Sequence, residues 1–310
     1  MALIVTDAHG SNDLTNNGGT GVTTGLVGSC ANADGSDDYL YIADNADFRV
    51  GGSAFTFAAW FSPANTSHVD AYFSKFNGSN GSYVLYQSEW SANKLTWIVG
   101  NDQGSLIRLE SALQLTSATW GFVAAGYVRG AQVGDIAGVS DTAPIEITST
   151  GHGLTTGDTI GIAGVSGTSA ADGTWTVTVT GTDTFTLDGS TGDTPGSGGR
   201  FTTRYIWLSV DNSARDIKWF YYDTDDDANT FKIFLDQSGS NHFTGKCDQF
   251  GFWKVALSDG QLTSLYNSGA GRDYASLSGL GLTTDLISFY EFEDDAPPAS
   301  SSRLALLGVG

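Results

Sequence analysis

Basic residues are scarce in this sequence. Only 14 Lys and Arg stand against 34 Asp and Glu among 310 residues, so the formal net charge is −20. Charged residues make up 15% of the chain, well under the roughly 25% of an ordinary soluble domain. Because phosphate affinity comes from Lys and Arg, this balance excludes an electrostatic nucleic-acid binder, and an anionic membrane surface would repel the chain. We therefore expect neither nucleic acid nor a membrane as a partner.

Long apolar runs are also missing. No run approaches the roughly 18 residues of a membrane-spanning helix. Residues 1–7 contain no basic region and no cleavage-site pattern, so we expect no signal peptide. If the protein works outside a cell, something other than a conventional leader must put it there.

Cysteine is rare, with only Cys30 and Cys247 in the chain. Two cysteines are too few for a disulfide scaffold, and they lack the spacing of metal ligands. Two interpretations stay open. Either both are small buried hydrophobes, as free cysteines usually are, or they form one disulfide that closes a long loop.

Strand signals dominate what the sequence does contain. Apolar residues make up 40% and aromatics 12%, too much for a disordered acidic chain. Runs rich in β-branched and aromatic residues, separated by Gly, Asn, Ser and Asp, lie at residues 54–61, 83–86, 95–99, 120–128, 204–210 and 231–235. Helical periodicity occurs once, at residues 258–267, with Ser258 as N-cap and Gly269 as a stop. The pattern predicts an all-β protein, a two-sheet antiparallel sandwich with one short helix.

Residues 131–201 differ in composition, because aromatics thin out and Thr, Gly and Ser take over. Short alternating segments at 145–148, 158–162, 173–179 and 184–187 predict a small β domain inserted into a hairpin of the sandwich. The Gly-rich stretch 192–199 is expected to return the chain as a flexible linker. The sandwich then consists of residues 1–130 and 202–295, followed by a C-terminal tail at 296–310.

Four ordered blocks carry a resemblance to a known family. They are residues 35–42 (GSDDYLYI), 55–61 (FTFAAWF), 120–127 (WGFVAAGY) and 243–269, which begins FTGKCDQFGFW. These blocks resemble the laminin-G-like, concanavalin A-like lectin jelly rolls, over about 26–129 and 202–270. The resemblance implies a jelly-roll fold and does not specify an activity, because this fold hosts many functions.

The insert has a resemblance of its own. Residues 143–158, which include the sequence HGLTTGD, together with residues 173–177 and 185–189, look like a small β module that recurs in phage tail, fibre and other virion proteins. This resemblance implies a virion surface protein and names no reaction.

The opening strand of those jelly rolls is missing at the N-terminus, and a similar segment stands at residues 286–294. Three interpretations stay open. The segment folds back beside its own N-terminus, as neighbouring domain ends permit, it completes a neighbouring copy, or it is an unrelated tail. Its apolar residues are the candidate assembly strand: Leu286, Phe289, Tyr290 and Phe292.

Catalytic patterns are absent. Sandwich glucanases need Glu-x-Asp-x-x-Glu on one strand, so that the carboxylates share a face, and that pattern does not occur. There is no Gly-x-Ser-x-Gly elbow or phosphate-binding glycine loop, and the four histidines lack ligand spacing, with His152 expected to have a structural role in a Gly-His-Gly turn. We expect the protein not to be an enzyme.

A structural calcium is the cofactor to consider, because calcium prefers clustered oxygen ligands. Asp34, Asp37 and Asp38 lie together, and the resemblance implies that Asp248 converges with them. The alternative is that the first three are turn formers and that Asp248 is hydrogen-bonded to the backbone. The acidic run 223–227 lacks the Gly and Glu of a calcium loop, so it is expected to be a solvated turn.

Trp90 is the candidate ligand platform, because it stands in the polar context SEWSAN, whereas most tryptophans of a sandwich lie in its core. The leading hypothesis is a non-enzymatic virion surface structural protein: a capsid decoration, fibre or tail-surface subunit that contacts other virion proteins and forms a homo-oligomer. The runner-up is a carbohydrate-binding adhesin that attaches to host glycans. Both place the protein on the virion surface, in an extracellular setting.

Overall fold

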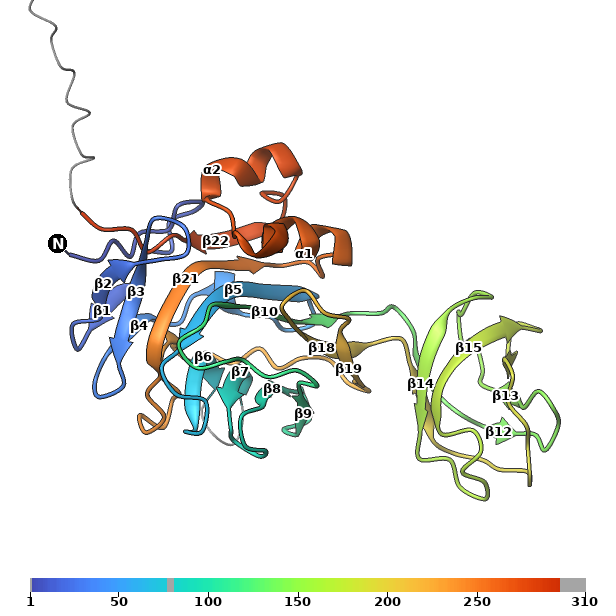
Figure 1. The fold of residues 1–310 in the computed structure, drawn as a ribbon. Coiled ribbons are helices and arrows are strands. Elements are labelled where there is room, and N and C mark those ends of the chain that lie inside the picture. Colours follow the sequence, from blue (N-terminus) through green and yellow to red (C-terminus); the bar gives the residue numbers. More distant parts are fainter. Residues whose placement is uncertain (1, 77–80, 296–310) are drawn as a thin grey trace, which may run out of the picture.

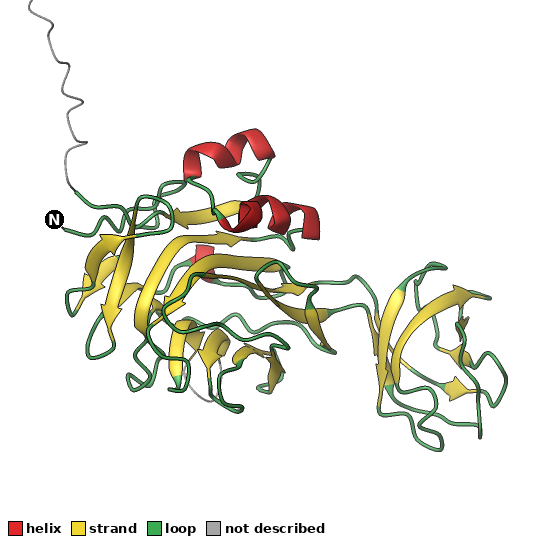
Figure 2. Ribbon diagram, in the orientation of Figure 1, coloured by secondary structure: helices red, strands yellow, loops and turns green. Residues whose placement is uncertain are grey.

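The computed structural model of the chain describes residues 2–76 and 81–295 (Figure 1). Two antiparallel sheets form a sandwich, a smaller β-lobe stands beside it, and two short α-helices lie outside one sheet (Figure 2). The predicted all-β sandwich is confirmed, and the number of helices is corrected from one to two. No helix in the described ranges is long and apolar enough to cross a membrane. The expected tail at 296–310 lies outside the described residues.

Each sheet of the sandwich is named here after one of its strands. The β7 sheet, in spatial order, contains β1 (Thr15–Asn17), β4 (Tyr39–Ile42), β20 (Phe231–Ile233), β6 (Asp70–Phe76), β7 (Gly81–Gln87), β8 (Leu95–Gly100) and β9 (Leu106–Glu110). The β5 sheet contains β19 (Asp216–Trp219), β18 (Tyr205–Val210), β10 (Gly121–Val128), β5 (Phe55–Pro63), β21 (Thr244–Trp253), β3 (Ser29–Asp34) and β2 (Gly21–Thr24), with β22 (Leu286–Tyr290) also paired to β21.

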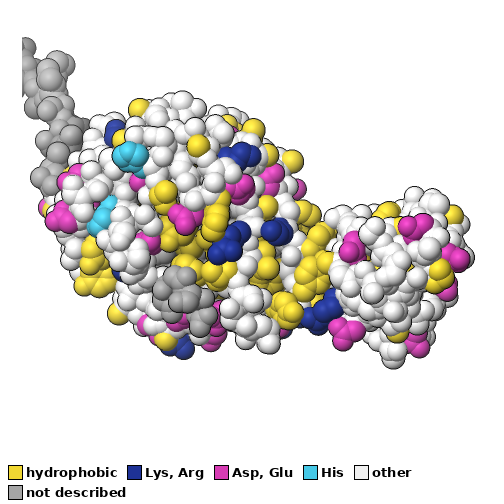
Figure 3. Space-filling view, turned by 90° about the horizontal axis from the view of Figure 1, so that it is seen from below, with side chains coloured by type: hydrophobic (Ala, Val, Ile, Leu, Met, Phe, Trp, Pro, Cys, Tyr) yellow, Lys and Arg dark blue, Asp and Glu magenta, His cyan; other side chains and the backbone are white. Residues whose placement is uncertain are grey.

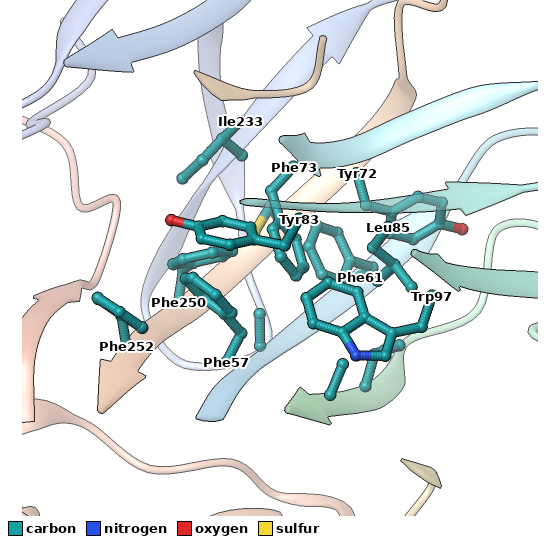
Figure 4. Close-up of a cluster of buried hydrophobic side chains, with 14 of the residues drawn as sticks. Phe57, Phe61, Tyr72, Phe73, Tyr83, Leu85, Trp97, Ile233, Phe250 and Phe252 are labelled. Carbon is teal, nitrogen blue, oxygen red and sulfur yellow. The ribbon is translucent and has the colours of Figure 1, made fainter. Parts of the chain in front are cut away.

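Aromatic side chains from both sheets fill the space between them (Figure 4). Alternation along β5 sends Phe57 and Phe61 into this core. The Phe57 ring lies 4.3 Å, centroid to centroid, from Phe252 of its own sheet and 4.8 Å from Tyr83 of the β7 sheet. The buried indole N–H of Trp97 donates to the carbonyl oxygen of Gly126, at 3.2 Å, so this large side chain leaves no polar group unpaired.

The opposite face of β5 is covered by helices (Figure 2). Helix α1 (Asp259–Tyr266) begins with a capping box between Ser258 and Gln261, and its Tyr266 ring stacks on Trp60 at 5.5 Å. The N-cap expected at Ser258 is therefore confirmed. Helix α2 (Tyr274–Leu277) was not predicted, because four residues are too short to show periodicity. The 3₁₀ turns are η1 (Ala46–Phe48), η2 (Asn267–Gly269) and η3 (Ser278–Leu280).

Strand β21 shares one edge between two partners. Residues 244–247 pair with β3 and residues 250–253 pair with β22, and between them Gln249 has a positive φ of 52° where the ladder is irregular. The N-terminal segment covers the other edge of β22, since the amide of Ala8 donates to the carbonyl oxygen of Phe289 at 2.9 Å. The candidate assembly strand thus pairs within its own chain.

The smaller lobe is the insert. Its sheet contains β11 (Val133–Asp135), β17 (Arg200–Thr202), β14 (Thr159–Ala163), β15 (Gly173–Val179), β16 (Thr184–Leu187), β13 (Glu146–Thr148) and β12 (Gly138–Val139). The two end strands, β11 and β12, are consecutive in the chain and two residues apart, so the sheet closes into a small barrel around its own apolar core. The lobe interrupts the hairpin of β10 and β18, whose last paired residues are Val128 and Tyr205.

The Gly-rich stretch 192–199 was expected to be a flexible linker, and the structure corrects this expectation. The amide of Gly196 donates to Val139 O and the amide of Ser197 to Ser166 O, both at 2.9 Å, so this stretch is part of the barrel wall. The chain crosses between the lobes at Gln132 and Thr203, which bond to each other. On the face seen in Figure 3, Lys and Arg side chains lie among acidic ones on the sandwich and close to the place where the lobes meet, while the insert shows acidic ones.

Strand registers divide the sandwich into two ends. The insert leaves beside the pairing of Tyr127 with Phe55, which marks the insert end. The opposite end, called the loop end below, is marked by the pairings of Pro63 with Gly245 and of Asp70 with Gln87. Loops 35–38, 64–69, 88–94, 111–120 and 236–243 gather at the loop end. The insert and these five loops therefore lie at opposite ends of the sandwich.

The two separate cores predict separable stability. Phe57→Ala should destabilise the sandwich by about 3–5 kcal/mol through lost burial and a cavity, and Phe185→Ala, in the insert core, should do the same to the insert. Differential scanning calorimetry should show that each variant lowers one transition and leaves the other in place. A common shift of all unfolding in either variant would contradict independent cores.

Candidate functional site

Trp90 stands at the tip of the hairpin that joins β7 to β8, at the loop end. The turn is held by Ser88 and Asn93, both with positive φ, and the Ser88 hydroxyl accepts the amide of Asn93 at 2.7 Å. Trp90 is 60% exposed, whereas the other seven tryptophans, all described, are buried or half-buried. The sequence prediction that Trp90 is the least core-like tryptophan agrees with this exposure.

Polar and charged groups surround the Trp90 ring. The guanidinium of Arg108, on β9, lies 4.8 Å from the ring centroid, within cation–π range. Burial raises the pKa of the neighbouring Glu89, the charge of Asp236 adds to this, and Arg108 opposes it. An exposed aromatic face beside a cation and carboxylates can pack on the apolar face of a sugar ring and bond its hydroxyls.

Asp236 orders the loop next to Trp90. Its carboxylate is 2% exposed and accepts hydrogen bonds from the Tyr86 hydroxyl at 3.1 Å and the Asn241 amide group at 2.7 Å. It also accepts the hydroxyl of Ser238 at 2.8 Å and the backbone amide of Gly239 at 3.0 Å. Burial alone would raise its pKa, but the hydrogen bonds from Ser238, Asn241 and Tyr86 outweigh burial and lower it. Asp236 is therefore a structural anion that fixes loop 236–241.

The acidic turn after β3 also lies at the loop end. Asp34, Asp37 and Asp38 each offer a carboxylate oxygen, and these atoms lie within 4.8 Å of one another. The buried Asp38 accepts the amide of Asp34 at 2.9 Å. Burial is the main cause of a raised pKa at Asp38, and the charges of Asp34 and Asp37 raise it further. Three carboxylates therefore lie close together, two of them exposed, and each offers the kind of oxygen ligand that calcium prefers.

Asp248 does not join this cluster, which corrects the expected set of four ligands. It is fully buried on β21, where Oδ2 accepts the amides of Leu26 at 2.8 Å and Val27 at 3.0 Å, and Oδ1 accepts the side chain of Gln249 at 3.1 Å. The loop that follows β2 thus occupies Oδ2, and the side chain of Gln249 occupies Oδ1. The alternative weighed for this residue, hydrogen bonding to backbone, is what the structure has.

The cysteines are both free and buried, so the first of the two interpretations is confirmed. Cys247 pairs with Ala31 in the ladder, and side chains alternate along β3. Cys30 therefore points to the opposite face of the sheet, away from Cys247.

His152 has the expected structural role in the insert. Its Nδ1 accepts the amide of Leu154 at 3.0 Å, and its Nε2 lies 3.1 Å from the carbonyl oxygen of Gly181. Both ring nitrogens are therefore used in holding the turn.

The acidic run 223–227 is anchored rather than fully solvated, contrary to expectation. Asp223 pairs with Arg129 at 3.2 Å and with Arg204 at 3.1 Å. The buried Thr224 hydroxyl donates to the carbonyl oxygen of Val50 at 2.8 Å. The run is thus tied to the rest of the sandwich at the insert end.

The candidate assembly strand is buried in its own chain. Tyr290 and Phe292 belong to the sandwich core, and Leu286 and Phe289 lie under the helices. Exchange of this strand between copies stays a prediction about the assembly.

The loop-end surface consists of the acidic turn and the surroundings of Trp90: Asp34, Asp37, Glu89, Trp90 and Arg108, with the buried Asp38 and Asp236 beneath them. Arg108, Glu89 and Asp236 were not predicted as members. Arg108 and Asp236 come from other parts of the chain, so only the strand order brings Arg108 to Trp90 and Asp236 close to Glu89. Glu89 is adjacent in sequence, and its position beside Trp90 was a signal that could have been used.

The class of the protein follows from comparison with known proteins. A laminin G family, described as the concanavalin A-like lectin/glucanases superfamily, matches residues 34–137. No curated protein compared with the chain matches it. The binding domain of Paraclostridial mosquitocidal protein 1 is similar in structure, with a TM-score of 0.51 and 10% identity over 86% of this chain and 52% of that chain. The fold is therefore a laminin G-like, concanavalin A-like jelly roll, and the chain spans about half of that binding domain.

Two further solved structures are similar at lower TM-scores. Domain 4 of AbnA, an extracellular arabinanase from Geobacillus stearothermophilus solved with arabinotriose, has a TM-score of 0.49 and 11% identity over 84% of this chain and 92% of that chain. The binding domain of botulinum neurotoxin serotype G has a TM-score of 0.47 and 10% identity over 86% of this chain and 50% of that chain.

A bound calcium predicts a chelator effect on stability. With calcium at about 100 times its Kd, binding adds about 2.7 kcal/mol, so EDTA should lower the melting midpoint of the sandwich by roughly 5–10 °C. Asp37→Asn, which removes one ligand charge from the exposed turn, should abolish the difference. Equal midpoints of the unaltered protein in calcium and in EDTA would rule the site out.

Asp248 predicts a pH dependence of stability. Burial raises its pKa to about 7, against the lowering by its hydrogen bonds, whereas an unfolded chain has a value of about 3.9. The folded state therefore holds the proton more tightly, and the stabilisation present below about pH 4 is lost as the pH rises through about 7.

Asp248→Asn isolates this effect, because the amide stays neutral and keeps an oxygen for the loop amides. In urea unfolding, the variant and the unaltered protein should have similar stability at pH 4.5, and the variant should be more stable at pH 8 by up to about 4 kcal/mol. A variant that loses stability equally at both pH values would refute the assignment.

Proposed function

We propose that the protein is a non-catalytic, glycan-binding subunit of a virion surface, which attaches to host glycans through its loop end. The observation that carries the proposal is the exposed Trp90 ring with Arg108 on it and Glu89 beside it, at the end of the sandwich opposite the insert. The matching family, described as lectins and glucanases, supports a carbohydrate ligand. The absence of the glucanase carboxylate motif from the sequence supports binding without hydrolysis.

The acidic turn also lies at the loop end, and it supports a binding role for this end of the molecule. Calcium held by Asp34, Asp37 and Asp38 would neutralise crowded carboxylates and stiffen the turn that leads into β4. An ordered turn reduces the conformational entropy that binding costs. We therefore propose calcium as a structural cofactor of the loop end, without contact to the glycan.

The virion setting rests on the insert. Its sequence resembles modules of phage tail and fibre proteins, and as a closed barrel it leaves its sheet without an open edge, projecting from the insert end. A net charge of −20 suits a protein that must stay soluble at high local density. We propose a homo-oligomer with other virion proteins as neighbours, displayed outside the cell.

A glycan array followed by titration tests the binding function. Trp90→Ala should weaken the best ligand by roughly tenfold, because an aromatic contact contributes about 0.5–1.5 kcal/mol beyond burial, and Trp90→Phe should retain part of the affinity. Tyr222→Ala is the matched control, since Tyr222 is 40% exposed and precedes the ion-paired Asp223 of the insert end. Unchanged binding by Trp90→Ala would exclude the loop-end site.

The second candidate is a purely structural decoration protein of the virion, favoured by the insert and by the deep burial of the jelly-roll strands. The same experiment separates the two functions. If no glycan on the array binds and light scattering shows a single defined oligomer, the structural proposal replaces the glycan-binding one.

A further inference from the structure

A second candidate site lies at the other end of the sandwich. An open cavity of about 420 Å³ is lined by Val128, Tyr205, Arg215, Leu257 and Asp259, with Ala256 and Ser258 completing the wall. Val128 and Tyr205 are the last paired residues before the insert, so the cavity opens beside the junction of the two lobes. Its size falls in the range of small-molecule sites, and neither Trp90 nor the acidic turn contributes to it.

Arg215 is held rigidly in this cavity. Its guanidinium carbon lies 4.0 Å from the centroid of the Trp207 ring, and Trp207 is fully buried. Nη2 donates to the carbonyl oxygen of Leu257. The side chain is only 13% exposed, so the cation is oriented before any ligand arrives.

Asp259, the ion-pair partner of Arg215, is much more exposed than Arg215 itself. Asp259 Oδ1 lies 2.7 Å from Arg215 Nε, but the Asp259 side chain is 85% exposed. The Nε–H is buried and has no aligned hydrogen-bond acceptor among the described residues. An exposed carboxylate in a poorly directed pair is easily displaced, and an arginine forms its strongest hydrogen bonds with a well-aligned carboxylate.

We propose that this cavity binds an acidic sugar, whose carboxylate replaces that of Asp259 on Arg215. The Tyr205 ring and Val128 form an apolar wall for the face of the sugar ring. The displaced Asp259 carboxylate is left free to accept sugar hydroxyls. The choice of a sugar rests on the proposed function, whereas the choice of a carboxylate rests on Arg215 alone.

Titration calorimetry on the full chain tests the site with a matched pair of compounds, methyl β-glucuronide and methyl β-glucoside, which differ only in the carboxylate. The glucuronide should bind and the glucoside should not. Arg215→Lys keeps the charge, loses the planar donor edge and should weaken binding at least tenfold. Equal binding of both compounds, or of neither, would overturn the proposal.

Asp259→Asn is the decisive variant, because it replaces the competing carboxylate with a neutral amide and leaves residue Arg215 unaltered. It should tighten glucuronide binding severalfold, and weaker binding would overturn the proposal. This variant keeps the test valid if Arg215→Lys fails to fold. If Trp90→Ala abolishes glucuronide binding and Arg215→Lys does not, the sugar sits at the loop end, which refutes this site and leaves the proposed function standing.

Discussion

The ladder along β21 breaks at one residue, Gln249, and both termini of the chain depend on that break. Before it, β21 pairs with β3, and after it the same edge pairs with β22. The N-terminal hairpin and the C-terminal strand therefore share one neighbour. Asp248, directly before the break, accepts two amides of the loop that follows β2, and the amide of Ser29 donates to Glu293 at 2.9 Å. The two partners together cover an edge of β21 that would otherwise be open, and these part-buried polar contacts hold the N-terminal and C-terminal segments in place.

The positions of the few basic residues show where the molecule uses positive charge. Arg129 and Arg204 converge on Asp223, and Arg200 lies 2.9 Å from Asp135, all where the two lobes meet. At the loop end, crowded carboxylates dominate. These three arginines therefore serve the joint between the lobes, whereas Arg108 and Arg215 lie at the two candidate sites.

Side-chain alternation made about half of the described strands predictable, because period two separates a core face from an outer face wherever residues such as Phe57 and Trp60 are large. Strand β6 escaped this reasoning, since its interior includes Lys75. That lysine is fully buried and bonds Asp44 and the carbonyl oxygens of Asp227 and Asn229. Its partners lie far away in the chain, so no local pattern marks it as a core residue.

The same limit explains what could be predicted of the candidate site. Trp90 was identifiable from its polar neighbours alone, and so was the acidic turn after β3. The surroundings of Asp248 were not, because they depend on a loop 222 residues away. Backbone hydrogen bonds hold residues 192–199 in the wall of the barrel, and amino-acid composition does not predict such bonds.

The attachment of the insert has a mechanical consequence. The lobe is attached at the ends of two adjacent strands of the β5 sheet, β10 and β18, and β10 also pairs with β5 (Figure 1). Tension on the insert would pull both strands lengthwise, whereas their ladder bonds lie across them. Such a pull shears the bonds between β10 and β5 all at once instead of peeling them one by one. The joint therefore resists tension along the direction of these two strands.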